Sequence, residues 1–499
     1  MLVDNRVEGD SRVQKAARSA ADRGWDVTLL GCSATGPERT WRLGGARVHV
    51  LPMSRRSQGA ATPATADADS SGGSSRGSIA VLKQRILTHG GWPLRVARLA
   101  RRPLEHAQVI WWRNAEGDRA WRHLEPGLWN YERLFGPLID ELAPDVIHAH
   151  DFRMLGVGAR AVERARNAGR RVKLVWDVHE FLPGMKPWRD NARWLPAHLA
   201  YEREYAPYAD AIVTVSDALA GMLVDEHHLA VRPTVVMNAP DVTAGGATAD
   251  DVPDIRELCG IDTSTPLLVY GGSATVQRGL RTVIDALPRL PGVHFAMVVA
   301  DPSAPHIRRY MAAAVRLGVA DRTHALPYVP HQQVSAFLSA ADVGVIPIHH
   351  WPNHEIALIT KFFEYSHARL PIVVSDVKTM AEAVRATGQG EVFRARDTAD
   401  FVRTVQAVLA DPKRYRAAYE GPDSPLAGWT WDAQADRLDA IYRSLLGDDA
   451  PPRGGATDVG PATEHDPATG RDPATEHDPA TERDPATGRD PASTETGSP

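Results

Sequence analysis

The sequence predicts an α/β protein with two tandem, doubly wound domains and a disordered tail. Short runs of β-branched residues alternate with helical patterns over most of the chain, which is typical of a parallel sheet with helices on both faces. The polar residues 241 to 254 separate two such series, and a Pro-rich repeat follows the second. We therefore expect domains at 1–240 and 241–430, a helix at 431–446 and a disordered tail at 447–499.

In the first series, Asp10 or Ser11 caps a helix that runs to about Arg23. Met1 to Val3 have the pattern of the last residues of a buried strand, which suggests that the natural chain starts further upstream. Residues 56–77 are rich in Ser, Gly, Ala and Thr and read as a flexible insertion. Strands are expected at 26–31, 47–51, 145–150, 173–178, 210–215 and 234–237.

The second series repeats the alternation, with helices expected at 279–287 and 331–341. The tail carries a six-residue repeat, Pro-Ala-Thr-(Glu/Gly)-(His/Arg)-Asp, which has too few apolar residues to offset chain entropy. Strands are expected at 267–270, 294–299, 323–326, 343–347, 372–375 and 391–393.

Composition narrows the class of protein. With 57 basic and 62 acidic residues the formal charge is −5, so no overall positive field favours nucleic acid. The two cysteines, Cys32 and Cys259, lie far apart and without metal-ligand spacing, which favours the reducing cytoplasm. The sequence shows neither a signal peptide nor an apolar run of membrane-spanning length.

The most informative segment runs from Thr360 to Asp376. A helix starting near Thr360 would place Glu364 close to the carboxyl edge of a parallel sheet, just before a buried strand at 372–375. Ligands bind at this edge, and a helix N-terminus there favours phosphate. An ordinary strand–helix unit with a surface glutamate is the alternative.

The segment resembles the donor-binding signature of retaining glycosyltransferases of the family-4 type (glycosyl transferases group 1), whose members often read PNKLFEYMAAGLPVV. The resemblance implies a GT-B fold, in which two Rossmann-like domains face each other across a cleft and the last helix crosses back to the first domain. It also implies that Glu364 holds the ribose hydroxyls of a sugar nucleotide, with Lys361 in the same donor site.

A second donor segment runs from Tyr270 to Gly279. Two glycines directly after a strand, Gly271 and Gly272, allow the backbone to approach a ligand closely. The segment resembles the family's YVGRLVPEKG loop, with Arg278 at its lysine position and Ser273 where an arginine is usual. The resemblance implies a diphosphate clamp with one charge fewer than usual. A plain glycine turn is the alternative.

The first domain supplies the candidate catalytic residue. His179 matches a family histidine near the transferred sugar and the β-phosphate, although a structural histidine is the alternative. Gly9 and Arg12 fall where the family has a short glycine loop near the acceptor and the donor phosphates. A capped helix start would also explain them.

His148 and His150 lie two residues apart at the end of a strand, so their side chains point to the same face. We expect that face to be the one toward the cleft. Their spacing to Asp151 and Glu180 would suit a metal. The family needs none, because helix dipoles and basic residues neutralise the leaving diphosphate. We therefore expect a metal-independent enzyme whose nucleotide-diphosphate sugar is a co-substrate, with no other cofactor.

The family has two glutamates in an E-x7-E pattern, and Ile356 stands at the first position. Glu355 is one residue away, so either it serves in place of the first glutamate or the chain lacks that acid.

The basic, Trp-containing stretch from Arg76 to Arg113 suits peripheral contact with an anionic membrane, which would place the protein at the inner face of the plasma membrane. A solvated helical face is the alternative.

Taken together, the resemblance implies retaining transfer of a hexose-type sugar to the hydroxyl of a glycan, lipid or small-molecule acceptor. A sugar-nucleotide epimerase of the same shape and a non-catalytic sugar-nucleotide-binding subunit are the alternatives.

Overall fold

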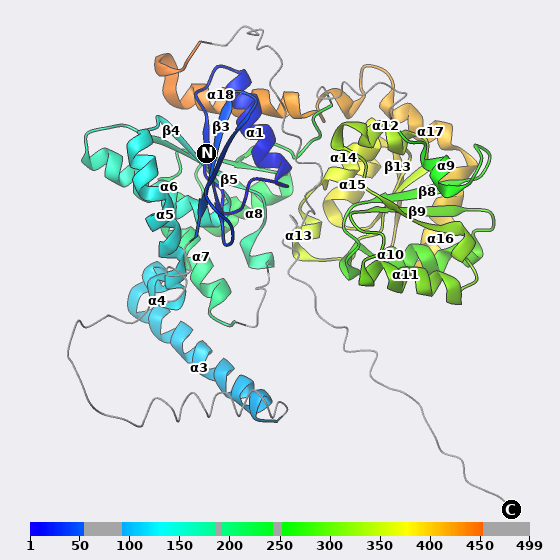
Figure 1. Ribbon diagram of the computed structural model, residues 1–499, viewed down its shortest axis with the longest axis horizontal. Coiled ribbons are helices and arrows are strands. Elements are labelled where there is room, and N and C mark those ends of the chain that lie inside the picture. Colours follow the sequence, from blue (N-terminus) through cyan, green and yellow to red (C-terminus); the bar gives the residue numbers. More distant parts are fainter. Residues whose placement is uncertain (54–91, 186–190, 243–251, 453–499) are drawn as a thin grey trace, which may run out of the picture.

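The computed structural model describes residues 1–53, 92–185, 191–242 and 252–452, without the side chains of 92–101. These residues form two α/β domains that lie side by side (Figure 1). The predicted insertion at 56–77 and most of the predicted tail at 447–499 lie outside the described residues.

The first sheet is assembled around Leu2. This residue pairs in parallel with Leu30 on one side and with Ala149 on the other, and so joins two groups of strands. One group has the order β1–β3–β2 and the other β4–β5–β6–β7. The strands are β1 (Thr28–Ser33), β2 (Arg39–Leu43), β3 (Ala46–Pro52), β4 (Val146–His150), β5 (Lys173–Val178), β6 (Ala211–Thr214) and β7 (Thr234–Val235).

Strand β2 was missed by the sequence prediction. It pairs antiparallel with β3 at the edge of the sheet, and its residues are exposed or only half-buried. A strand of this kind lacks the buried β-branched run by which the others were recognised.

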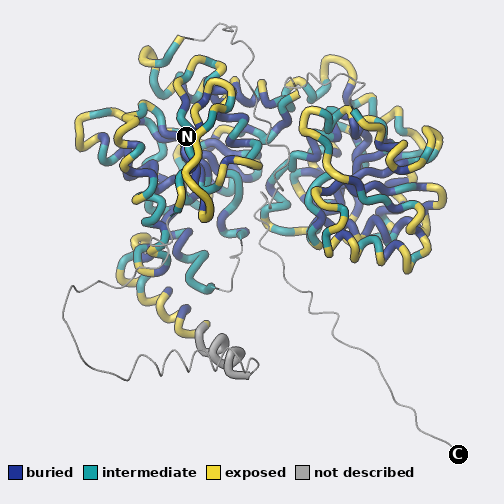
Figure 2. The backbone as a smooth tube through the Cα atoms, viewed as in Figure 1, coloured by how far each residue is buried: buried dark blue, intermediate teal, exposed yellow. Residues whose placement is uncertain are grey.

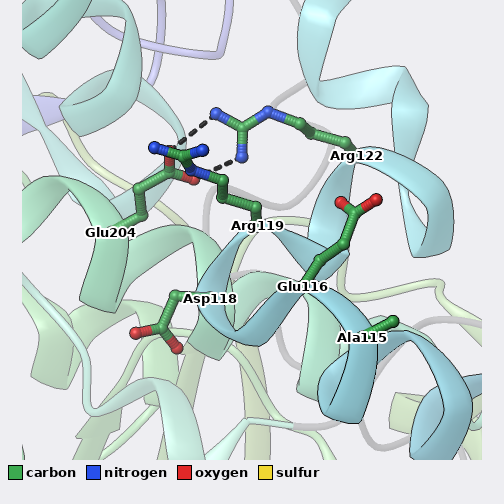
Figure 3. A pocket seen from close by; sticks show the side chains of 6 residues that line it. All are labelled: Ala115, Glu116, Asp118, Arg119, Arg122 and Glu204. Atoms are coloured by element: carbon green, nitrogen blue, oxygen red, sulfur yellow. Dashed lines mark hydrogen bonds and ion pairs between the residues drawn. The ribbon is translucent and has the colours of Figure 1, made fainter.

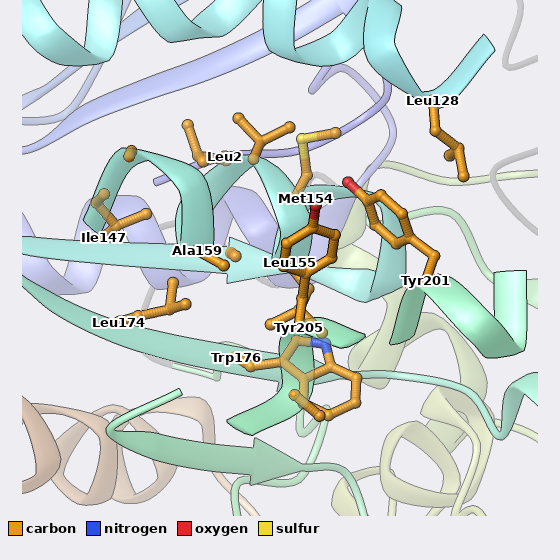
Figure 4. Close-up of a cluster of buried hydrophobic side chains, with 14 of the residues drawn as sticks. Leu2, Leu128, Ile147, Met154, Leu155, Ala159, Leu174, Trp176, Tyr201 and Tyr205 are labelled. Atoms are coloured by element: carbon orange, nitrogen blue, oxygen red, sulfur yellow. The ribbon is translucent and has the colours of Figure 1, made fainter. Parts of the chain in front are cut away.

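Helices cover both faces of the first sheet. On one face, Leu2, Leu155, Trp176 and Tyr201 belong to an apolar cluster between the sheet and its helices (Figure 4). The helices of this domain are α1 (Ser11–Asp22), α3 (Trp92–Glu116), α4 (Trp121–Leu124), α5 (Trp129–Leu142), α6 (Asp151–Asn167), α7 (Trp194–Tyr205) and α8 (Asp217–His227).

The second sheet has six parallel strands in the order β10–β9–β8–β11–β12–β13. Numbered along the chain this is 3-2-1-4-5-6, the order of a Rossmann-like domain, which places a ligand crevice between β8 and β11. The strands are β8 (Leu267–Gly271), β9 (His294–Val299), β10 (Thr323–Pro327), β11 (Val343–Ile346), β12 (Ile372–Ser375) and β13 (Gly390–Phe393).

Two apolar clusters, one on each face, bury the second sheet. The helices that form them include α10, α14 and α16, each of which buries one apolar face. The helices of this domain are α9 (Ile255–Cys259), α10 (Leu280–Ala286), α11 (Pro305–Arg316), α12 (Val334–Ser339), α13 (Pro352–Glu355), α14 (Thr360–His367), α15 (Lys378–Thr387), α16 (Thr398–Ala410) and α17 (Pro412–Arg416).

The last helix, α18 (Trp431–Leu446), leaves the second domain and packs on α1 of the first (Figure 1). Trp431 anchors this contact. Its indole Nε1 donates to the Lys15 carbonyl and the Ser19 hydroxyl, each at 3.2 Å, and the Lys15 ammonium lies 4.7 Å from its ring centroid.

Helix α3 extends away from the body of the first domain, and much of its described surface is exposed (Figure 2). Three large apolar residues on it face solvent: Leu104, Ile110 and Trp111, with exposed fractions of 67%, 62% and 68%. Among the helices within the described ranges, none combines the length and apolarity needed to cross a bilayer.

We predict that Trp431→Ala lowers the free energy of unfolding by about 3 to 5 kcal/mol, the usual cost of truncating a large buried aromatic residue. The indole also closes the α1–α18 contact, so its loss should let α18 separate from the first domain. Urea denaturation followed by tryptophan fluorescence and circular dichroism measures the change.

Asp432→Ala is the matched control, because the neighbouring Asp432 side chain is 65% exposed and only forms a surface ion pair with Arg23. A loss below 1 kcal/mol for Trp431→Ala would contradict the anchoring role.

Candidate active site

The crevice of the second domain opens where β8 ends at two glycines. The amide of Gly271 donates to the Tyr365 hydroxyl at 2.9 Å. Gly272 has a φ of +120°, and a Cβ there would lie 2.7 Å from both Cε and Nζ of Lys361. Only glycine therefore lets the lysine lie across the turn, with its ammonium 5.3 Å from the centroid of the Tyr270 ring.

Glu364 lies one turn after Lys361 on α14 and is half-buried. Burial raises the pKa of its carboxyl group, while the nearby charges of Lys361, His331 and Lys15 lower it. Among the described residues, no side chain or amide forms a hydrogen bond or ion pair with this carboxylate. Since Lys15 belongs to α1, the glutamate also lies close to the first domain.

Arg278 and Ser273 belong to the turn that joins β8 to α10. Gly279 has a φ of +72°, and a Cβ there would lie 1.8 Å from the Pro347 carbonyl oxygen. The amide of His349 donates to the Gln277 carbonyl at 2.8 Å. The turn is thus held against the loop after β11, and Arg278 is buried just before α10 begins.

Glu355 is held by groups of its own domain. One carboxylate oxygen contacts His350 Nδ1 at 2.6 Å, and the other accepts from the Lys378 amide at 2.7 Å, at the start of α15. His350 also contacts Asp376 at 2.9 Å. Both oxygens of the Glu355 carboxylate therefore already have partners within the second domain.

Ile356, at the first glutamate position of the family pattern, packs into the apolar cluster of the first domain. Its carbonyl accepts a hydrogen bond from the Ser216 hydroxyl, and the neighbouring Asn353 accepts from the Phe181 amide at 3.0 Å. Residues 353–356 therefore fasten the second domain to the first.

A buried carboxylate, Asp177, organises the polar residues of the first domain. The Arg12 guanidinium donates to its two oxygens at 2.8 and 3.0 Å, and to the Val236 carbonyl at 2.7 Å. These contacts, above all the Arg12 charge, hold the pKa of Asp177 well below its usual range despite burial.

His179 lies between two carboxylates. Its Nε2 is 3.3 Å from Asp177 and its Nδ1 is 3.4 Å from Asp151. Burial lowers the pKa of the imidazole, but the two carboxylates outweigh it and hold the pKa well above its usual value. His179 therefore carries a positive charge at neutral pH.

The expectation that His148 and His150 face the cleft is wrong, and Arg12 is likewise buried rather than presented to a ligand. The exposed fractions of the three residues are 2%, 0% and 4%. The two imidazoles stack with centroids 4.2 Å apart, and both lie within 3.4 Å of Asp177. Attraction to the buried carboxylate turns all three inward.

His148, His150 and Asp177 place one ligand atom each within 4.8 Å of one another, a spacing compatible with a metal ion. The donor set does not fit a cation well, because Arg12 occupies both oxygens of Asp177. A metal ion would have to displace this buried guanidinium and lie close to the charged His179.

The loop between Val3 and α1 lies at the carboxyl edge of the first sheet, as the glycine turn does in the second sheet. Val7 has a φ of +69° and Gly9 a φ of +84°, and the Val7 carbonyl accepts from the Gln14 side chain at 2.9 Å. Asp10 caps α1 by accepting from the Val13 amide. A positive φ at a β-branched residue stores strain of the kind found at functional sites.

Neither the central position of Asp177 in this cluster nor the contact of Asp151 with His179 was predicted from the sequence. One signal was present: Asp177 and His179 lie two residues apart at a strand end and so point to the same side. The Asp177 partners Arg12 and His148 are far away in sequence and become neighbours only through the fold.

A hollow on the first domain is lined by other residues (Figure 3). It is crossed by the ion pair of Arg122 with Glu204, 2.6 Å long. Its remaining lining residues are Ala115, Glu116, Asp118 and Arg119. It contains none of the predicted site residues.

Two family models match the chain. The model for glycosyl transferases group 1 matches residues 265–411, and that for glycosyltransferase family 4 matches residues 91–243. The chain belongs to the family-4 type of glycosyltransferases. This confirms the family predicted from the donor segments.

Curated relatives agree with this assignment. The D-inositol 3-phosphate glycosyltransferase 1 of Catenulispora acidiphila is 25% identical over 324 residues, which cover 60% of this chain and 72% of that protein. The glycogen synthase of Mycobacterium tuberculosis is 25% identical over 317 residues, covering 62% and 71%.

Solved structures share the GT-B fold of this glycosyltransferase. Sucrose-phosphate synthase from Thermosynechococcus elongatus superposes with a TM-score of 0.59 at 14% identity, covering 87% of this chain and 92% of that one. Anabaena HepE in complex with UDP and glucose superposes with a TM-score of 0.56 at 14% identity, covering 89% and 98%. The predicted fold is thereby confirmed.

We predict that the stabilisation contributed by charged His179 is pH-dependent. Because the folded pKa lies above the unfolded one, the contribution is fully present below about pH 6.5 and is lost as pH rises through the folded pKa. The difference in unfolding free energy between wild type and His179→Gln should therefore be larger at pH 6 than at pH 9.

Chemical denaturation at three pH values measures this difference, with His367→Gln as the control histidine outside the cluster. A difference that grows with pH would mean that His179 is neutral in the folded protein.

Proposed function

We propose that this glycosyltransferase moves a hexose from a nucleotide-diphosphate sugar to an acceptor hydroxyl, with retention of configuration and without a metal ion or other cofactor. The Glu364 carboxylate carries the proposal. It lies at the crevice of a Rossmann-like sheet, beside Lys361 and the glycine turn, without a partner among the described residues. Such a carboxylate suits the two hydroxyls of a ribose.

The diphosphate of the donor would lie over the glycine turn. A Cβ at Gly271 would meet no atom within 4 Å, so the backbone there is open to close approach; Lys361 lies across Gly272, and Arg278 stands just before α10. Two cations and the N-terminal end of the α14 helix would balance the charge that develops on the leaving group. No divalent cation is needed for that balance.

In the first domain, His179 would act on the transferred sugar and the β-phosphate as a positively charged donor. Its two nitrogens face Asp151 and Asp177 at 3.3 to 3.4 Å, distances long enough for a ligand oxygen to compete for one N–H. With retention, the diphosphate leaves from the face that the acceptor attacks, so no protein nucleophile is required.

The relatives support a hexose donor and leave the acceptor open. HepE is described with UDP and glucose, and the curated relatives include a glycogen synthase. Others act on D-inositol 3-phosphate. We propose a glycan, lipid or small-molecule hydroxyl as the acceptor.

The function is tested by incubating the protein with UDP- and GDP-hexoses and a panel of acceptors, with nucleoside diphosphate release as the readout. We expect acceptor-dependent release, a product anomer matching the donor by NMR, and no effect of EDTA. Donor conversion without acceptor would indicate an epimerase, and binding without turnover a non-catalytic subunit.

Glu364→Ala should weaken binding of the nucleoside diphosphate by roughly 1.5 to 3 kcal/mol, the worth of hydrogen bonds to a charged group. Isothermal titration calorimetry measures the dissociation constant. Glu382→Ala, on the exposed surface of α15, is the matched control. An unchanged dissociation constant for Glu364→Ala would remove the donor-site assignment.

Helix α3 supports a second, independent proposal, peripheral binding to an anionic membrane. Exposed Leu104, Ile110 and Trp111 lie on a helix that also carries Arg102 and Arg113, as in helices that lie in a lipid interface. The predicted contact stretch begins at Arg76, and its part before residue 92 lies outside the described residues.

We expect the protein to bind vesicles containing phosphatidylserine more tightly than neutral vesicles, and less tightly at high salt, because each basic residue near the surface contributes about 1 kcal/mol. Trp111→Glu should reduce flotation with vesicles, whereas Trp41→Glu on the edge strand β2 should not. Equal binding to both vesicle types would leave α3 a solvated face.

A further inference from the structure

The crossover helix α18 reaches the polar cluster of the first domain through one hydroxyl. Tyr442 is fully buried near the end of α18, and its Oη lies 2.5 Å from His148 Nδ1. His148 Nε2 in turn lies 3.3 Å from the Asp177 carboxylate. The same carboxylate oxygen lies 3.3 Å from His179 Nε2. The last helix is thus linked to the candidate catalytic histidine by one hydrogen bond and two close polar contacts, of which that between His148 Nε2 and Asp177 lies outside hydrogen-bond geometry.

The proton positions along this path follow from chemistry. Burial lowers the pKa of His148, so its ring is neutral, and burial raises the pKa of Tyr442, so its hydroxyl stays protonated. A carboxylate only accepts hydrogen bonds, which places the single N–H of His148 on Nε2, toward Asp177. Nδ1 is then an acceptor, and the Tyr442 hydroxyl is its donor.

We propose that Tyr442 is a positioning residue for the glycosyl transfer reaction: by donating to His148 it sets the tautomer and orientation through which Asp177 holds His179. The inference rests on the catalytic role proposed for His179. It assigns α18 a part in catalysis, in addition to its packing on α1.

The hydroxyl and the ring of Tyr442 have separable roles. The ring packs edge-on against Trp25, with centroids 5.5 Å apart, and belongs to the apolar cluster of α1 and α18. The ring also lies edge-on to the His148 imidazole, with centroids 5.9 Å apart, but only the hydroxyl forms a hydrogen bond with His148. Tyr442→Phe therefore keeps the packing and removes the single donor to Nδ1.

A matched control exists one turn earlier on α18. Asp439 accepts from the Trp25 indole at 2.8 Å and from Arg443 at 2.8 Å, so it anchors the same helix through groups other than His148. Asp439→Asn should weaken the anchoring and leave the histidine cluster unchanged.

The first measurement needs no substrate. In full-length protein labelled with ¹⁵N-histidine, and with the His179 signals assigned through His179→Gln, Tyr442→Phe should shift the ring nitrogen resonances of His148 and His179. Asp439→Asn should leave the His179 resonances in place. Unmoved His179 signals in Tyr442→Phe, or equal shifts in both variants, would overturn the proposal.

The second measurement uses turnover, followed as nucleoside diphosphate release. Tyr442→Phe should lower kcat by roughly tenfold, the scale of a small misplacement of a reacting group, with the donor KM within about twofold because the second domain binds the donor. In a His148→Asn background the same change should cause no further loss. An equal loss in both backgrounds would overturn the proposed route through His148.

If no donor and acceptor support turnover, the proposed function fails, while the resonance shifts still decide whether Tyr442 positions His179.

Discussion

The structure of the first domain depends on one buried ion pair, that of Asp177 with Arg12. A carboxylate at the end of β5 can be buried only if its charge is balanced and its oxygens are hydrogen-bonded. Arg12 meets both needs and also donates from Nη1 to the Val236 carbonyl. The pair thereby joins α1, β5 and the residue that follows β7, and it leaves His179 facing two carboxylates. Removing either partner would leave the other as an unpaired buried charge.

In the second domain, glycine residues allow the close packing on which the crevice depends. Both its glycine turn and Gly279 approach atoms that any Cβ would displace, the Lys361 ammonium in one case and the Pro347 carbonyl in the other. Crowding at these two points brings the ends of β8, β11 and α14 into one crevice.

The sequence revealed regular elements well and long-range polar contacts poorly. Buried strands such as β5 and β12 carry their own signal in consecutive β-branched residues, and Gly272 and Glu364 lie in recognisable segments. Edge strand β2 carries no such signal. The inward orientation of Arg12, His148 and His150 was not predicted because their common partner, Asp177, is brought to them by strand order and by the position of α1. Local periodicity contains no information about either.

The contact made by Ile356 links the two domains thermodynamically. Its side chain is buried in the apolar cluster of the first domain although it belongs to a loop of the second, so separation of the domains would expose it to water at a cost of about 1.5 to 3 kcal/mol. A charged residue at this position would favour the opened form instead. Any movement that separates the two domains would therefore have to offset the burial of this one side chain.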